Sequence, residues 1–297
     1  MTGTPLFTGV CTAMITPFCG GQIDYPALDG LLERQISAKV DALLIAGTTG
    51  EPSTLSDAEW ESLTAHALTR IAGRVRVIVG TGSNNLRVTL RRARFAADHG
   101  ADAQLCVTPY YNKTTQAGLV AHFTAMAEAG GIPVILYNVP SRTGLNITPE
   151  TALELSRNPL INGIKEASGN ISQVAKIAQL CGDELNIYSG NDDQVVPLLS
   201  LGGKGVISVV SNVKPELVHN CCKAFFDGDT AKARQLQLEM LPLADALFCE
   251  VNPIPVKYAM NVLGWEAGEC RLPLVEPSDA HKEQIEKALR AEGLIKE

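Results

Sequence analysis

The sequence predicts an α/β protein, a TIM-type (β/α)8 barrel with a C-terminal helical appendage. Eight short runs rich in Val, Ile and Leu alternate with longer stretches of helical periodicity, the pattern of βα units around a buried parallel sheet. The strand signals stop near residue 229 of 297, and an α/β barrel occupies roughly 200 to 250 residues. We therefore assign residues 1–228 to the barrel and residues 229–297 to a helical domain. A doubly wound open sheet is the alternative.

The elements follow one another along the chain as βα units. Residues 25–40 and 56–73 have helical periodicity. The second stretch opens with Ser56 as N-cap and Glu59 three residues later, which is the signature of a capping box. The expected strands are 9–16, 42–47, 75–82, 103–109, 133–140, 162–167, 186–190 and 204–212, and the expected helices beyond the barrel are 229–248, 253–264 and 278–295.

Composition and charge limit the partners of this chain. With 45% hydrophobic residues it can bury a large core, and its formal net charge of -7 with scattered Lys and Arg predicts no nucleic-acid partner. The first residues have the pattern of a strand, not of a signal peptide, and no window approaches the 18 or so apolar residues of a membrane span. Eight cysteines without a C-x-x-C pair, and histidines without ligand spacing, predict reduced thiols, no metal site and a cytoplasmic location.

Polar residues close the predicted strands, at the end of a barrel where active sites are built. Strand two ends in GTTGE (47–51), strand four runs into TPYYN (108–112), and strand five runs into YNVPSRTG (137–144). Strand six holds Lys165, and strand seven ends in SGND (189–192). These segments are therefore the candidate functional residues.

Lys165 is the strongest single signal among them. If its side chain points into the barrel, alternation sends Ile164 and Glu166 outward and points Gly163 inward, which would leave space beside the lysine stem. Partial desolvation would disfavour the ammonium and lower the pKa of Lys165, and a neutral amine can form a Schiff base with a ketone or aldehyde. From this segment alone, a structural lysine paired to a carboxylate is the alternative.

Three neighbouring motifs could serve such chemistry. Tyr137 lies on the adjacent predicted strand, roughly 4.8 Å away, and its phenol could move protons, although it could equally be a core aromatic. The turn at 47–51 offers two hydroxyls and backbone N–H groups to a carboxylate, or it is an ordinary βα turn. Arg142 could clamp a carboxylate or be a solvated loop residue. Residues 80–85 lack the third glycine of a dinucleotide fingerprint, so no nicotinamide site is expected.

Together with GIKEA (163–167) and GVISV (205–209), these motifs closely resemble the dihydrodipicolinate synthase family, within the lysine-dependent pyruvate aldolases. The resemblance extends from the first strand to NPIPVKYA (252–259), nearly the whole chain. It implies that Lys165 forms a Schiff base with pyruvate and that the enamine attacks L-aspartate 4-semialdehyde. Cyclisation would then give 4-hydroxy-tetrahydrodipicolinate, in lysine and diaminopimelate biosynthesis.

The resemblance also implies roles for further residues. Tyr137 would be the general acid and base, and Thr48 would link it by hydrogen bonds to Tyr111 of a neighbouring subunit. The enzyme would then be a homo-oligomer, at least a dimer and commonly a tetramer. No metal or organic cofactor is implied, because the protonated imine is itself the electron sink. The residues implied to bind substrate are Thr49 for the pyruvate carboxylate, Arg142 for the aldehyde substrate, and Gly190 and the Ile207 carbonyl beside the lysine.

This sequence departs from the family pattern at two places. Thr114 stands where family members commonly have proline, which we expect to change only local stiffness. The site at which regulated relatives bind lysine is also altered, because the usual two histidines and a glutamate are replaced. Without that glutamate a lysine ammonium loses its charge partner, so weak or absent feedback inhibition is expected. The replacing residues are Asp57, Trp60 and Val88, while Asn84 and Tyr110 are retained.

Two other functions compete with this interpretation. One is cleavage of N-acetylneuraminate or of a 2-keto-3-deoxy sugar acid on the same scaffold; Thr48 and Arg142 favour the synthase, since relatives of the neuraminate type typically have GSTGE in the turn and lack the arginine. The other is a non-catalytic barrel that binds a keto acid for regulation. An intact set of Lys165, Tyr137 and Thr48 argues against it.

Overall fold

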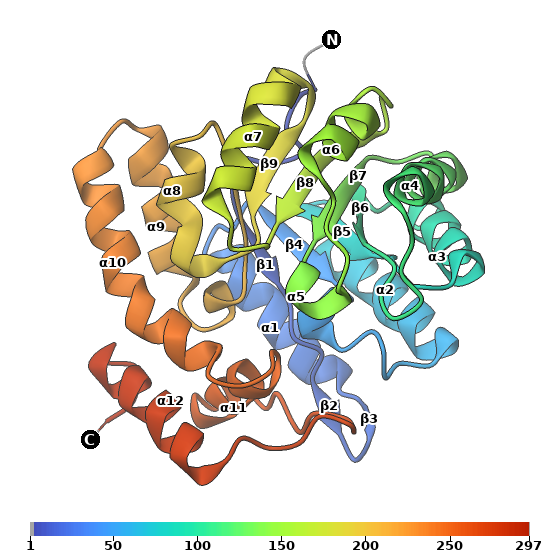
Figure 1. Cartoon of the computed structure of the whole chain (residues 1–297). Coiled ribbons are helices and arrows are strands. Elements are labelled where there is room, and N and C mark those ends of the chain that lie inside the picture. Colours follow the sequence, from blue (N-terminus) through green and yellow to red (C-terminus); the bar gives the residue numbers. More distant parts are fainter. Residues whose placement is uncertain (1–2, 297) are drawn as a thin grey trace.

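The structure, a computed structural model, describes residues 3–296 and contains a closed barrel of eight parallel strands (Figure 1). The order around the barrel is β1-β10-β9-β8-β7-β6-β5-β4, and β1 pairs with both β4 and β10. This closure confirms the predicted barrel and excludes the open sheet. The strands are β1 (Gly9–Ala13), β4 (Ala42–Ile45), β5 (Arg76–Gly80), β6 (Ala103–Val107), β7 (Val134–Asn138), β8 (Ile161–Glu166), β9 (Asn186–Ser189) and β10 (Gly205–Ser208).

Helices and short 3-10 turns connect the strands. The capping box predicted at the start of α2 is present, since Ser56 Oγ accepts from Glu59 N at 3.2 Å and Glu59 Oε2 accepts from Ser56 N at 2.8 Å. The elements are α1 (Tyr25–Ser37), η1 (Thr48–Gly50), α2 (Asp57–Ile71), α3 (Leu86–Asp98), α4 (Gln116–Gly130), α5 (Pro140–Thr143), α6 (Pro149–Ser156), α7 (Ile171–Cys181), η2 (Gly182–Glu184), η3 (Asp192–Gln194), α8 (Val195–Leu199), η4 (Val210–Asn212) and α9 (Pro215–Phe226).

Three helices follow the barrel, as predicted: α10 (Thr230–Leu247), α11 (Ile254–Val262) and α12 (Asp279–Ala291). Figure 1 shows them along the left and lower sides of the barrel, with α5 at the centre of the view. Gln237 of α10 accepts from Val196 N at 2.9 Å and donates to the Asp192 carbonyl at 2.9 Å. The helical segment therefore packs directly on the barrel, and its treatment as a separate domain from residue 229 remains a prediction.

Two local features differ from the sequence prediction. The eighth strand was expected to reach residue 212, but it ends at Ser208 and residues 210–212 form η4. The cause is a change of hydrogen-bond partner, because the Val209 and Val210 N–H groups donate to Asp192 Oδ2 at 2.9 and 3.2 Å instead of to a neighbouring strand. A small hairpin of β2 (Phe18–Cys19) and β3 (Gln22–Ile23) was not predicted.

The core has two layers, set by the alternation of side chains along each strand. Along β8, Ile164 packs outward against the helices and Lys165 points inward. Phe7 and Tyr188 close the inside of the barrel, with stacked rings whose centroids lie 4.4 Å apart. Burying each large apolar side chain contributes roughly 1.5 to 3 kcal/mol. A shift of one residue along a strand would expose its apolar side chains, so their burial fixes the strand register and with it the residues that face the barrel mouth. Within residues 3–296, no helix is long and apolar enough to cross a lipid bilayer.

Candidate active site

Lys165 and Tyr137 meet at the mouth of the barrel. Strands β7 and β8 pair in a register that sets Tyr137 beside Lys165, and the lysine Nζ lies 4.4 Å from the centre of the tyrosine ring. Lys165 is 5% exposed and Tyr137 is 7% exposed, so both side chains are nearly removed from bulk water. The expected proximity of amine and phenol is therefore present in the structure.

A second tyrosine, Tyr188 of β9, flanks Lys165 on its other side. Its hydroxyl already donates to the Phe7 carbonyl at 3.0 Å, and burial raises the pKa of Tyr188 far above its usual value. Tyr137 is different, because its hydroxyl forms no hydrogen bond with the rest of residues 3–296 and the residue lines a cavity. Of the two phenols beside the lysine, Tyr137 is the one free to exchange protons with a substrate.

Glycines make room around the lysine. A Cβ on Gly190 would lie 3.1 Å from Lys165 Cε and 2.5 Å from Ala167 Cβ, so only glycine leaves the lysine stem unobstructed at this point. Gly163 does point inward, but a Cβ there would meet the Asn186 carbonyl at 2.6 Å and the Tyr188 ring at 3.2 Å. The expectation that Gly163 frees space beside the lysine is therefore wrong, and Gly190 has that effect.

Lys165 lies at the floor of a cavity of about 200 Å³, which we call the catalytic cavity. Its wall carries hydroxyls, two amides and a guanidinium, and such polar groups can bind a small keto acid. Ile207 is buried inside β10 and does not line this cavity, whereas Val209 does. The lining residues are Thr48, Thr49, Tyr137, Val139, Ser141, Arg142, Lys165, Ala167, Gly190, Asn191, Val209, Phe248 and Asn252.

Residues of the C-terminal segment, Asn252 and Lys257, hold the GTTGE turn in place. Asn252 Nδ2 donates to Thr49 Oγ1 at 3.0 Å, which leaves the threonine hydroxyl hydrogen free to donate. Glu51, in the left-handed backbone region at φ 55, forms a fully buried ion pair with Lys257, at 2.9 Å between Oε1 and Nζ. Burial lowers the pKa of Lys257, and the Glu51 carboxylate opposes that shift. The barrel and the C-terminal helices therefore build this turn together.

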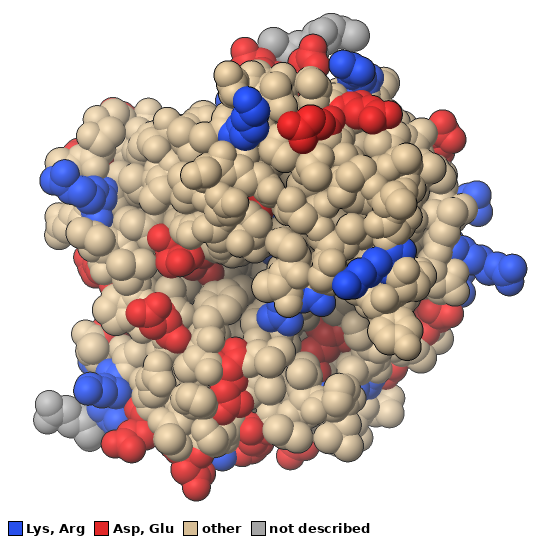
Figure 2. Space-filling view, in the orientation of Figure 1, with Lys and Arg blue, Asp and Glu red and all other residues tan. Residues whose placement is uncertain are grey.

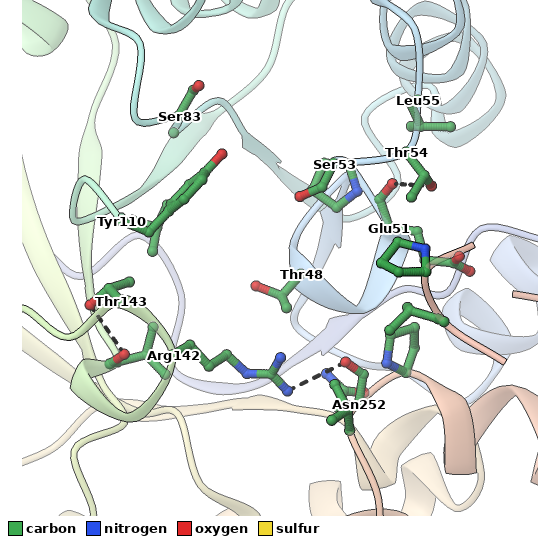
Figure 3. A pocket seen from close by; sticks show the side chains of 18 of the residues that line it. Thr48, Glu51, Ser53, Thr54, Leu55, Ser83, Tyr110, Arg142, Thr143 and Asn252 are labelled. Atoms are coloured by element: carbon green, nitrogen blue, oxygen red, sulfur yellow. Dashed lines mark hydrogen bonds between the residues drawn. The ribbon is translucent and has the colours of Figure 1, made fainter. Parts of the chain in front are cut away.

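Arg142 lies in the short helix α5, not in the loop that the sequence predicts. It is exposed, and its Nη2 donates to the Asn252 carbonyl at 3.3 Å. Figure 3 shows the side chain extending from α5 toward Asn252, with Thr48 nearby. The guanidinium keeps donors available for a carboxylate at the edge of the catalytic cavity.

In the space-filling view, acidic side chains lie to the left of the central hollow and basic ones to its right (Figure 2).

Tyr111 does not join the other candidate residues within this chain. It is 92% exposed and adopts φ 68, in the loop between β6 and α4. Among residues 3–296 no hydrogen bond connects it to Thr48, or Thr48 to Tyr137. Such an exposed tyrosine is available to a second subunit, so the predicted contribution across an interface stays a prediction.

Comparison with known proteins agrees with this geometry. The sequence profile of the Dihydrodipicolinate synthetase family matches residues 6–292. The chain belongs to this family. It is 51% identical over 294 residues to a 4-hydroxy-tetrahydrodipicolinate synthase of Thermoanaerobacter sp. (strain X514), covering 99% of each chain. The dihydrodipicolinate synthase structure from Thermotoga maritima gives a TM-score of 0.95 at 41% identity, covering 98% of this chain and 100% of that one.

A third relative was solved with lysine bound. The structure of the Cyanidioschyzon merolae enzyme with lysine bound superimposes with a TM-score of 0.95 at 39% identity, covering 98% of this chain and 100% of that one. The resemblance to the dihydrodipicolinate synthase family inferred from six motifs is confirmed by these comparisons.

In this family member, a second cavity of about 500 Å³, which we call the outer chamber, adjoins the catalytic cavity. Of the five residues that are predicted from the sequence to occupy the positions of a relative's lysine site, Asp57, Val88 and Tyr110 line the outer chamber. Trp60 is fully buried behind it, with Nε1 donating to the Gly80 carbonyl at 3.2 Å, and the Asn84 carbonyl accepts from the Asn112 amide at 3.1 Å.

Three residues important to the site were not singled out from the sequence. Asn252 contacts both Thr49 and Arg142, and Lys257 anchors Glu51. The signal for them lay in the NPIPVKYA segment, which belongs to the family resemblance but carries no local chemical pattern. The third, Asp192 of the SGND motif, is buried, and burial raises its pKa, while hydrogen bonds from the Ser208 hydroxyl and from the Val209 and Val210 N–H groups oppose the shift.

Proposed function

We infer that this chain is a 4-hydroxy-tetrahydrodipicolinate synthase, an enzyme of lysine biosynthesis that condenses pyruvate with L-aspartate 4-semialdehyde. The observation that carries this conclusion is the buried Lys165 amine beside the free Tyr137 phenol, at the floor of the catalytic cavity. Full-length identity of 51% to a synthase supports the same reaction.

In the proposed reaction, Lys165 Nζ attacks C2 of pyruvate and forms a carbinolamine. Loss of water gives the protonated imine, and loss of a proton from C3 gives the enamine. C3 of the enamine then attacks the aldehyde carbon of the second substrate, whose oxygen takes up a proton. Tyr137 gives and receives these protons, because its hydroxyl has no other partner among the described residues and its ring lies against the lysine Nζ.

The proposed binding groups for the two carboxylates both contact Asn252, Thr49 through the side-chain amide and Arg142 through the main-chain carbonyl. Thr49, whose hydroxyl oxygen already accepts from Asn252, donates its hydroxyl hydrogen to the pyruvate carboxylate. Arg142 holds the carboxylate of the aldehyde substrate with its planar guanidinium. Gly190 gives the pyruvyl group access to the lysine, whereas Ile207, which the family resemblance also implies, does not line the catalytic cavity and Val209 does. The reaction uses no metal or organic cofactor, since the imine takes up the electrons.

The functional unit is proposed to be a homodimer or a tetramer of such dimers, located in the cytoplasm. Thr48 would connect Tyr137 to Tyr111 of the neighbouring subunit, which explains why Tyr111 is exposed in a single chain. Mixing a Tyr111→Ala variant with a Lys165→Ala variant tests this directly. Each alone is expected to be inactive or nearly so, and mixed dimers regain activity because one site then holds both residues. No recovery after subunit exchange would refute the shared site.

Feedback inhibition by L-lysine is proposed to be weak or absent. Val88 replaces the glutamate that would receive a lysine ammonium, and the carboxylate of the nearby Asp57 already pairs with Arg91. The measurement is synthase rate against L-lysine concentration. Half-maximal inhibition below about 1 mM, equivalent to a binding free energy stronger than about -4 kcal/mol, would contradict the proposal.

The assay for the function is pyruvate consumption by purified protein, with and without L-aspartate 4-semialdehyde. Consumption that requires the aldehyde is expected. Pyruvate release from N-acetylneuraminate or a 2-keto-3-deoxy sugar acid, with no aldehyde-dependent consumption, would instead assign the chain to the sugar-acid lyases of the same superfamily.

A further inference from the structure

The outer chamber contains a cation that the condensation does not use. Arg92 of α3 lines the chamber and is 7% exposed. Its Nε is buried without a hydrogen-bond partner, and no hydrogen bond joins its guanidinium to any other group within the described residues 3–296. The guanidinium lies over the Trp60 ring, with its central carbon 5.0 Å from the centroid, so one face is covered while its edge keeps free donors.

A buried guanidinium without a hydrogen-bond partner destabilises the folded protein. An arginine remains charged in proteins even where burial lowers its pKa, as it does for Arg92. A buried charge without a good partner costs several kcal/mol, and a carboxylate placed in its plane would recover much of that through two charge-assisted hydrogen bonds. The unpartnered Nε of Arg92 is therefore available to an anion.

The acidic groups around the chamber do not supply that anion. Asp57 Oδ1 is 3.9 Å from Arg92 Nη2, beyond hydrogen-bond distance, and lies much closer to Arg91. Glu61 also turns to Arg91, at 3.6 Å. On the far wall, Glu51 is occupied by the Lys257 ammonium.

Because these carboxylates are already paired, the chamber offers a free guanidinium but no free carboxylate. It therefore suits an anion better than an ammonium.

We propose that the outer chamber binds a small carboxylic acid without an ammonium group, with its carboxylate on Arg92. The volume of about 500 Å³ lies in the range of small-molecule sites. Hydroxyls of Ser53, Ser83 and Tyr110 on the chamber wall are placed to meet the remainder of the ligand. Thr48 and Arg142 line both cavities, so the bound acid lies beside the catalytic cavity without occupying Lys165.

The test is calorimetric titration with succinate of wild type, Arg92→Gln and Arg94→Gln. Arg94 lies on the same helix but is exposed and outside the chamber, so its variant removes one charge without altering the site. Each protein is titrated untreated and after treatment with pyruvate and borohydride, which fills Lys165. Wild type and Arg94→Gln are expected to bind one succinate per chain in both states, and Arg92→Gln at least tenfold more weakly.

Two results would overturn the proposal. One is the absence of saturable succinate binding, or equal affinity in Arg92→Gln and wild type. The other is tighter binding of L-lysine than of succinate, which would show that the chamber accepts an ammonium. Thermal unfolding of Arg92→Gln verifies that the variant is folded. The mass of the borohydride-treated chain reports separately on the Schiff base, so a missing adduct counts against the proposed reaction, and the untreated proteins still decide the role of Arg92.

Discussion

Removal of the buried Lys257 ammonium should destabilise the protein and loosen the catalytic turn. In a Lys257→Met variant, Glu51 loses the contact of 2.9 Å between Nζ and Oε1 and keeps the Arg271 N–H at 2.9 Å. The Glu269 carbonyl loses its donor at 2.7 Å as well. With side-chain exposures of 1% and 0% for the pair, water cannot replace these contacts.

The size of the effect follows from leaving Glu51 charged and unpaired. Breaking a buried pair by removing one partner costs about 3 to 5 kcal/mol, which corresponds to a fall in Tm on the order of 10 °C for a chain of this size. The assay is thermal unfolding at one fixed protein concentration, with KM for pyruvate measured on the same samples. KM should rise, because Thr48 and Thr49 lie three and two residues before Glu51 in the same turn.

A double variant provides the matched control. Lys257→Met with Glu51→Gln removes both charges, so it should recover at least half of the lost Tm, since a neutral amide costs far less to bury than a carboxylate. This reasoning would be refuted if Lys257→Met alone lowered the free energy of unfolding by less than about 1 kcal/mol, or if the double variant were less stable than the single one.

Three further predictions follow from other contacts. Gly190→Ala should lower kcat/KM for pyruvate at least tenfold and should also lower Tm, because its Cβ would lie 3.1 Å from Lys165 Cε and 2.5 Å from Ala167 Cβ; steady-state rates near those of wild type would contradict it. Asn252→Ala should raise KM for pyruvate more than it lowers kcat, since it frees the Thr49 hydroxyl, whereas an unchanged KM would leave Asn252 without a positioning role. The hydrogen bond to Arg271 lowers the pKa of Glu59 from 4.5 to about 2, so this pair stabilises the fold above pH 4.5 and loses its effect as pH falls toward 2. The free energy of unfolding should differ between wild type and Glu59→Gln by about 1 kcal/mol after allowance for solvent screening, and this difference should shrink over that pH range. A difference in Tm that is independent of pH would count against the pair.

The sequence was sufficient to predict the part of the site that lies on adjacent strands of the regular β-barrel. Adjacent parallel strands place Tyr137 and Lys165 at one level, so the pair could be predicted from strand order alone. The barrel and the C-terminal helices were predictable for the same reason, since a repeated apolar period defines them.

Prediction from sequence failed where a contact depends on distant segments. Asn252 and Thr49 are separated by 203 positions, and no local pattern reports their hydrogen bond. β10 ends where two backbone N–H groups donate to the Asp192 carboxylate instead of to a neighbouring strand. The strand propensity of the local sequence does not report this contact. Gly163 was given a role that belongs to Gly190, because alternation predicts the direction of a side chain but not which neighbour fills the space.

The most direct test of the account is to identify the residue that pyruvate modifies. The protein is treated with pyruvate and borohydride, digested, and analysed by tandem mass spectrometry beside a Lys165→Ala variant. The account predicts one reduced pyruvyl adduct, on the peptide that contains Lys165, and none in the variant. An adduct on another lysine, or equal labelling of the variant, would contradict the assignment of the nucleophile and the proposed reaction that depends on it.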